Sequence, residues 1–405
     1  MREIEFSTMF EVGPNAGLGD AFFDAFSAHH QIRVNRLHIE WPDAWRQLVQ
    51  FGLNSHGPDV SEIGTTWLGG LNSMESLRPF TAGECALLGD AEIHPQALWQ
   101  ACQSQQSNSL LAIPWTLDLR VVLYRQDWLR EAHVDETTAF IDAVRFFDTL
   151  RKLEAAGHKA PLGLTTCKAN SRLIHDLACW VWSAGGDLRS PDGQRMMLMD
   201  PRSRTGLEAY FGLNKFITPS ADGLSEEQVF DAFLAGKIGV AVLPERTYPE
   251  AATNRSNAVA EVADNVGIAM LMQTPYIGGS ALSIWRYSSD YQSALKLIQA
   301  LTSLETWQML IKQQHPFLPA RMDALEHSPL GSMPDFPVIQ KSLANGRSFR
   351  SGYRWSAVEG RMAVVVEQLW AALRANPELD IPREVEGRFF DLCERLDRTI
   401  LASNS

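Results

Sequence analysis

The chain has 405 residues, of which 45% are hydrophobic and 21% charged, and its formal net charge is −12. This composition predicts a globular protein, and the length predicts two large lobes, because a single core rarely serves more than about 250 residues. The acidic charge argues against nucleic acid and an anionic membrane surface as partners, since both would repel the chain.

The chain shows neither a membrane-spanning nor an export pattern. No apolar run reaches the roughly 20 residues that a spanning helix needs. The first residues, MREIEFSTMF, alternate like a strand and lack the basic start, apolar stretch and cleavage site of a secretion signal. This pattern leaves two locations open, that of a cytoplasmic protein and that of a periplasmic or extracytoplasmic protein whose secretion signal is absent from this sequence.

The first part of the chain alternates strand and helix patterns. In chain order these are a strand at Ile4 and Phe6, a helix with Phe22, Phe23 and Phe26, a strand over 32–39, a helix with Trp45, Leu48, Val49 and Leu53, a strand over 58–64, and extended segments at 111–113 and 121–124. Such a βαβα order predicts a mainly parallel sheet covered by helices.

The second part is richer in helices. We expect helices over 140–156, 173–184, 294–310, 358–373 and 385–401, and strands over 238–243, 266–270 and 281–285. The helix over 173–184 is predicted to stop at Gly185-Gly186. These strands give a second lobe its own sheet, and we expect the sheet of each lobe to be mainly parallel and flanked by helices.

Five cysteines, at positions 85, 102, 167, 179 and 393, are odd in number and widely spaced. This pattern argues against a disulfide framework and against a structural zinc site. No cofactor and no metal are expected.

Several short segments, taken in order, carry a family resemblance. They are Gly57-Pro58-Asp59-Val60, Thr65-Thr66-Trp67, Ile113-Pro114-Trp115, Gly185-Gly186-Asp187, Phe233 to Val240, Gly278-Gly279-Ser280 and Leu318-Pro319-Ala320-Arg321. Together they resemble the family 1 extracytoplasmic solute-binding proteins of ABC transporters, the group that includes maltose-binding protein. The resemblance covers nearly the whole chain.

The resemblance implies a two-lobed α/β fold of the periplasmic-binding-protein type, with residues 1–117 and 276–316 in lobe one and 118–275 and 317–405 in lobe two. It implies a monomer that holds a sugar or oligosaccharide between its lobes, closes on it and delivers it to the membrane permease subunits of an ABC transporter. Crossings between the lobes are expected near residues 116–120 and 273–278.

A sugar site needs aromatic faces for C–H surfaces and fixed polar groups for hydroxyls. In lobe one the candidates are Glu11, Trp41, Thr66, Trp67, Trp115 and Gly279, and Asp118 is a candidate at the start of lobe two. Trp67 follows a predicted strand, where open α/β sheets place ligands. Trp41 contacts ligand or packs at a helix entry, and Trp115 and Asp118 face a cleft or pack at a crossing.

In lobe two the candidates are His175, Glu245, Arg246 and Trp355. The carboxylate and guanidinium of Glu245 and Arg246 would bind hydroxyls or an acidic group, or form an exposed ion pair. The other tryptophans are expected to be structural, at positions 45, 99, 128, 180, 182, 285, 307 and 370.

Two other classes of function stay open. A ligand sensor that signals to a partner protein would use the same binding site. A carbohydrate-active enzyme would use paired carboxylates, for which Glu11, Asp118 and Glu245 are available. No nucleophile, metalloprotease, Walker or dinucleotide motif appears in the sequence, so we expect no enzyme.

Overall fold

A computed structural model of the chain describes residues 1–10, 18–167, 172–217, 223–253, 258–313, 317–349, 352 and 355–401. The chain forms two compact units. Unit 1 comprises Met1–Asp118, Ile277–Ser332 and Ser348–Ser356, and unit 2 comprises Leu119–Tyr276, Met333–Arg347 and Ala357–Ser405.

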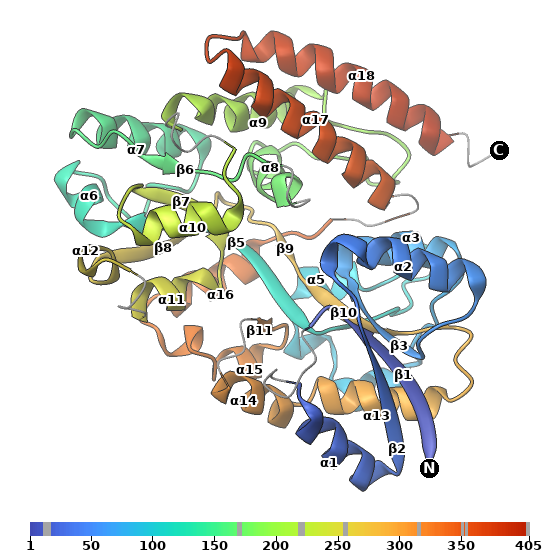
Figure 1. Ribbon diagram of the computed structural model, residues 1–405. Coiled ribbons are helices and arrows are strands. Elements are labelled where there is room, and N and C mark those ends of the chain that lie inside the picture. Colours follow the sequence, from blue (N-terminus) through green and yellow to red (C-terminus); the bar gives the residue numbers. More distant parts are fainter. Residues whose placement is uncertain are drawn as a thin grey trace. The chain divides into compact units, whose positions relative to one another are not determined.

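Unit 1 is built on a five-stranded sheet of order β2-β1-β3-β10-β4 (Figure 1). Its strands are β1 (Arg2–Thr8), β2 (Ile32–His38), β3 (Val60–Gly64), β4 (Ile113–Pro114) and β10 (Ser280–Ile284). Strands β1, β2 and β3 are parallel, and β10 is antiparallel to both of its neighbours. The two connections between these parallel strands, from β1 to β2 and from β2 to β3, each contain a helix, as a parallel pair requires.

The helices of unit 1 pack the apolar residues of this sheet into one core. They are α1 (Asp20–His30), α2 (Trp41–Asn54), α3 (Leu68–Ser73), α4 (Ala82–Leu88), α5 (Gln96–Ala101), α13 (Tyr291–Leu301), α14 (Leu304–Lys312) and α15 (Met322–Leu325). The core includes Phe6, Ile63, Trp115 and Trp285, and all four are 0% exposed. Strand β3 is buried along its whole length, because it lies inside the sheet.

Unit 2 has a sheet in which β5 (Thr116–Arg125) lies between β7 (Val240–Pro244) and β8 (Val266–Met270). Both of these pairings are antiparallel, whereas β6 (Leu162–Gly163) pairs parallel with β7. The expectation that the second sheet is mainly parallel is therefore wrong, because its central strand β5 is antiparallel to both β7 and β8. The physical reason is that β5 enters unit 2 directly from unit 1 and not through a βαβ crossover.

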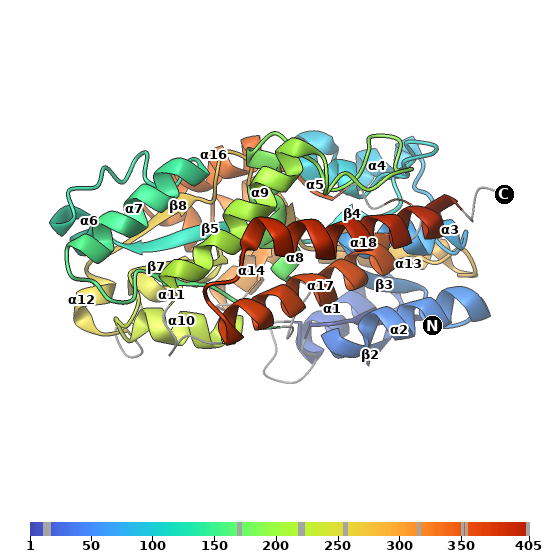
Figure 2. The same ribbon diagram turned by 90° about the horizontal axis from the view of Figure 1, so that it is seen from above.

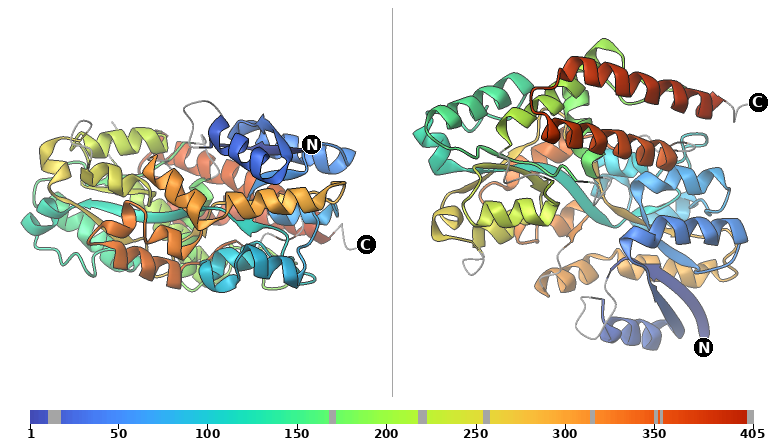
Figure 3. Two further views of the ribbon diagram at one scale, coloured as in Figure 1. Left: turned by 90° about the horizontal axis from the view of Figure 1, so that it is seen from below. Right: turned by 45° about the horizontal axis from the view of Figure 1, so that its top comes forward.

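Helices cover unit 2, and two long ones lie side by side at its edge (Figures 1 and 2). The helices are α6 (Gln126–Glu131), α7 (Ala143–Ala155), α8 (Arg172–Ser183), α9 (Pro201–Gly212), α10 (Glu226–Leu234), α11 (Thr247–Thr253), α12 (Ala260–Ala263), α16 (Phe336–Asn345), α17 (Trp355–Ala375) and α18 (Ile381–Leu401). The pair α17 and α18, red in Figure 3, is joined by a hydrogen bond of 3.1 Å from Arg361 Nη1 to Thr399 Oγ1.

Most predicted elements are confirmed, and 266–270 matches β8 residue for residue. The single helix expected over 294–310 is wrong, because α13 ends at Leu301 and α14 starts at Leu304. The Ser303 hydroxyl accepts a hydrogen bond from Thr306 N–H and caps the second helix. Hydrophobic periodicity alone does not reveal such a break, because the apolar residues of the two helices continue one pattern along the sequence.

The unit boundaries after Asp118 and Tyr276 lie one residue from the expected lobe boundaries. Residues 317–332 and 348–356, however, belong to unit 1, where the expected division had placed them in lobe two. Residues 317–332 belong to unit 1 because they contain β11 (Leu318–Pro319), which pairs with Thr116 and Leu117 of unit 1.

All five cysteines are free thiols, and Cys102, Cys179 and Cys393 are buried. Among the described residues, no helix is both long and apolar enough to cross a membrane.

Candidate functional site

Three tryptophans of unit 1 form a cluster at the start of α2 and the end of β3. The ring centroids of Trp41 and Trp67 lie 5.6 Å apart, and those of Trp45 and Trp67 lie 6.1 Å apart. Trp41 is 41% exposed, and the other two are half-buried. We call these three residues the tryptophan cluster. Sequence analysis assigned Trp45 to the core, although its spacing of four residues from Trp41 places both on one helix face.

Local backbone geometry positions this cluster. Strand β3 ends at Gly64, and the 3₁₀ helix η1 (Thr65–Trp67) follows at once. A Cβ atom on Gly64 would lie 3.2 Å from the Trp67 ring, so the glycine leaves room for the indole. Thr66 is half-buried in the same turn and carries a hydroxyl group.

A buried carboxylate, Glu62, organises the end of β1. It is 1% exposed, and its Oε2 accepts hydrogen bonds of 2.7 Å from Thr8 Oγ1 and from Met9 N–H. Burial raises the pKa of the Glu62 carboxyl, and its hydrogen bonds oppose this shift. Glu62 was not among the predicted site residues, because its only signal in the sequence is that a glutamate interrupts a predicted strand.

Trp115 is a core residue, and the expectation that it faces an open cleft is wrong. Its side chain is 0% exposed, stacks on Phe10 at 4.3 Å and donates a hydrogen bond of 3.2 Å to the carbonyl of Leu301. Asp118, three residues later, is half-buried at the last position of the first unit 1 segment. Candidate Glu11 lies outside the described residues.

Gly279 is required by a close approach of two backbones. Its φ is +141°, and a Cβ atom there would lie 2.0 Å from the carbonyl oxygen of Thr116. Its own carbonyl accepts a hydrogen bond of 3.0 Å from Thr65 N–H. The glycine therefore fixes the backbone that leads into the tryptophan cluster through Thr65.

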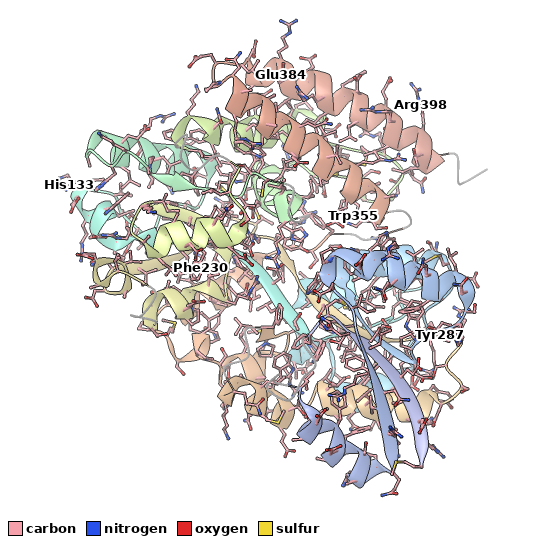
Figure 4. All side chains as sticks on the ribbon, in the orientation of Figure 1. His133, Phe230, Tyr287, Trp355, Glu384 and Arg398 are labelled. Atoms are coloured by element: carbon pink, nitrogen blue, oxygen red, sulfur yellow. The ribbon has the colours of Figure 1, made fainter. Side chains whose placement is uncertain are left out.

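Trp355 is the first residue of α17, as Figure 4 shows, and its side chain is 2% exposed. Its ring centroid lies 4.9 Å from that of Phe349. Because the indole is buried, its truncation is expected to cost stability.

In unit 2, His175 stacks on Tyr276 with centroids 3.9 Å apart and rings 16° from parallel. Its Nε2 lies 3.4 Å from Glu359 Oε1, and both side chains are buried. This contact links α8 to α17 inside unit 2.

Glu245 and Arg246 follow β7 and do not form the exposed ion pair that was one alternative. Glu245 is 0% exposed, and its Oε2 accepts a hydrogen bond of 2.6 Å from Leu119 N–H. Arg246 contacts Glu226, the first residue of α10, at 3.2 Å. Glu226 also contacts Arg120 and Arg172. Arg120, Arg172 and Glu226 were not among the predicted site residues, because they are far apart along the chain.

The described residues contain no group of three or more histidine, cysteine, aspartate or glutamate side chains that could hold a metal ion. The polar candidates described above carry guanidinium, carboxylate and hydroxyl groups, and such groups bind hydroxyls and oxyanions.

The family profile of the bacterial extracellular solute-binding proteins matches residues 21–338. A curated relative, a probable ABC transporter-binding protein from Deinococcus radiodurans, is 23% identical over 270 residues, or 63% of this chain. That match spans 61% of the relative's own length.

Solved structures show a similar fold. An ABC transporter solute-binding protein from Thermotoga lettingae, bound with α-D-tagatose, gives a TM-score of 0.76 at 18% identity, covering 99% of this chain and 100% of that one. The sugar-binding protein MalE from Xanthomonas citri gives a TM-score of 0.79 at 18% identity, covering 99% of this chain and 98% of that one. The chain therefore has the fold of the two-lobed periplasmic binding proteins.

Proposed function

Because the chain belongs to the family of bacterial extracellular solute-binding proteins, we propose that it captures a sugar or an oligosaccharide and delivers it to an ABC transporter. The protein works as a monomer outside the cytoplasm and hands its solute to membrane permease subunits. It binds the sugar without catalysing its conversion. The sugar-binding proteins of the same fold support the class of solute.

The observation that carries this proposal is the tryptophan cluster. Soluble proteins bury most large aromatic side chains, so an indole that is 41% exposed beside a second, half-buried indole needs a reason. Indole faces cover the apolar C–H surface of a sugar ring. The cluster therefore serves as the platform on which the sugar lies.

The polar half of a sugar site lies beside these rings. Thr66 belongs to the same 3₁₀ turn as Trp67. A hydroxyl group both donates and accepts hydrogen bonds, which matches a sugar hydroxyl. Glu62 fixes the neighbouring backbone at Met9 and so keeps this surface preformed.

The proposal is tested by a thermal-shift screen with mono- and oligosaccharides, followed by calorimetric titration. At a concentration of 100 times Kd, a sugar that binds only the folded state adds about 2.7 kcal/mol to the free energy of unfolding. Trp67→Ala and Trp41→Ala are expected to weaken affinity by about 1 to 2 kcal/mol each, or about 5- to 30-fold.

Trp128→Ala is the matched control, because Trp128 is also half-buried but belongs to unit 2, where it stacks on His158. Equal affinity of wild type, Trp67→Ala and Trp41→Ala for a sugar from the screen would refute the platform. Chromatography of that sugar after long incubation tests the absence of catalysis, which a product peak would contradict.

A further inference from the structure

Three arginines of unit 2 converge on one carboxylate, that of Glu226. Arg120 Nη1 donates to Oε2 at 2.8 Å, and Arg246 Nη2 donates to Oε1 at 3.2 Å. Arg172 Nη1 also donates to Oε1. The arginines come from β5, from the segment after β7 and from the first position of α8, whereas Glu226 starts α10, the helix on which Figure 4 labels Phe230.

The three arginines are not equivalent. The Arg120 side chain is 0% exposed, and its Nε and Nη2 donate to the two carboxylate oxygens of Asp176 at 2.6 and 3.3 Å. A buried charge needs such a partner. The side chains of Arg172 and Arg246 are 26% and 19% exposed. The side chains of Arg172 and Arg246 are therefore partly exposed to solvent, whereas Arg120 and Asp176 are buried together.

Arg172 and Arg246, which we call the arginine pair, lie at the edge of the sheet where ligands are bound in open α/β folds. Strands β6 and β7 are parallel, so their carboxyl ends share an edge. Arg246 comes two residues after β7 ends at Pro244. Thr165 and Thr166, just after β6, are 2% and 1% exposed, and within the described part of the chain their hydroxyl oxygens have no hydrogen-bond partner.

The chemistry of this edge suits an oxyanion. A guanidinium group is a planar fork of N–H donors that matches the two oxygens of a carboxylate or a phosphate. A buried hydroxyl without a partner lowers the stability of the folded protein, and a bound oxygen would recover this loss. The neighbouring acidic group of Glu245 is fully buried and bound to the Leu119 N–H, so it does not point its charge outward with the arginines.

We propose that the solute is an anionic sugar, bearing a carboxylate or a phosphate, and that Arg172 and Arg246 bind this oxyanion. The inference rests on the proposed function, since it names the class of sugar. Arg172 and Arg246 are separated by 74 positions in the sequence and are brought together by their shared contact with Glu226.

The test is calorimetric titration of the full chain with four ligands: galacturonate, glucose 6-phosphate and the neutral galactose and glucose. The wild type is expected to bind one anionic sugar at least about tenfold more tightly than its neutral counterpart, with affinity falling as salt rises. The comparison of galacturonate with glucose 6-phosphate distinguishes a carboxylate from a phosphate.

Arg172→Gln and Arg246→Gln are each expected to lose about tenfold or more in affinity for the anionic sugar and to keep the affinity for neutral sugars. Arg172→Lys keeps the charge without the fork and is expected to lose less. Arg204→Gln is the control, because Arg204 is 32% exposed in the same unit and pairs with Glu208 at 2.7 Å. Circular dichroism checks that each variant is folded, and the lysine variant replaces any glutamine variant that is not.

Absence of binding of both anionic sugars to the wild type would overturn the inference, as would equal anionic-sugar affinities of wild type and folded arginine variants. If neutral sugars bind while anionic ones do not, the inference fails and the proposed function stands. If no sugar of either class binds in the titrations or in the wider screen, both fail.

Discussion

Trp115→Ala and Trp67→Ala are expected to separate stability from binding. Both tryptophans follow a strand of the unit 1 sheet by one or three residues, and both replacements remove the same indole. Trp115 is 0% exposed, whereas Trp67 is half-buried. The first change should therefore act on the free energy of unfolding and the second on sugar affinity.

The magnitude follows from what the Trp115 indole contacts. Truncation of a buried tryptophan to alanine costs about 3 to 5 kcal/mol, because a cavity remains where the ring had packed. The Trp115 ring stacks on Phe10 and lies 6.4 Å from the Trp307 ring. Its hydrogen bond to Leu301 also disappears, and the carbonyl there loses that partner. A value near the upper end of the range is expected.

In a domain of about 150 to 250 residues, 1 kcal/mol shifts Tm by about 2 to 4 °C, so Trp115→Ala should lower Tm by about 6 to 20 °C. The assay is thermal unfolding followed by far-ultraviolet circular dichroism, with urea denaturation to obtain the free energy. For Trp67→Ala we expect a loss of Tm well below that of Trp115→Ala. A Trp67→Ala protein that loses as much Tm as Trp115→Ala would refute the distinction between core and platform.

Two further changes test the polar and backbone features of unit 1. Because burial raises the pKa of Glu62, the folded state holds this proton more tightly than the unfolded state, and the free energy of unfolding falls as pH rises from the unfolded pKa to the folded one. Glu62→Gln should flatten that fall in urea denaturation at pH values above the ordinary glutamate pKa of about 4.3, and an unchanged slope would contradict the assignment. Gly279→Ala should strongly lower Tm or prevent folding, since its Cβ would meet the Thr116 carbonyl at 2.0 Å. Gly83→Ala in α4, where a Cβ meets nothing within 4 Å, should instead raise stability by about 0.5 to 1 kcal/mol, and similar Tm values for the two variants would disprove the close approach.

The sequence alone determined the order and kind of most elements, because hydrophobic periodicity is a local property that each segment carries by itself. Phe22, Phe23 and Phe26 predicted α1, and the alternation at Ile4 and Phe6 predicted β1. The ordered short segments also predicted the family correctly, through the resemblance and not through periodicity.

Only the tertiary structure decided which predicted site residues are exposed. Trp115 and Trp67 look alike in the sequence, yet the first is in the core and the second is half-buried beside the exposed Trp41. Burial depends on what other segments pack against a residue, and Phe10, Leu301 and Trp307 are distant from Trp115 along the chain.

The same reason explains the arginine pair of unit 2. Nothing in the sequence around Arg172 indicates Arg246 or Glu226, and Glu245 alone looks like an exposed loop carboxylate. Folding brings the start of α8, the start of α10 and the end of β7 to a common place and buries Glu245 against a backbone N–H. A local sequence pattern predicts where a helix begins, but the packing of the whole unit determines which residues contact its first side chain.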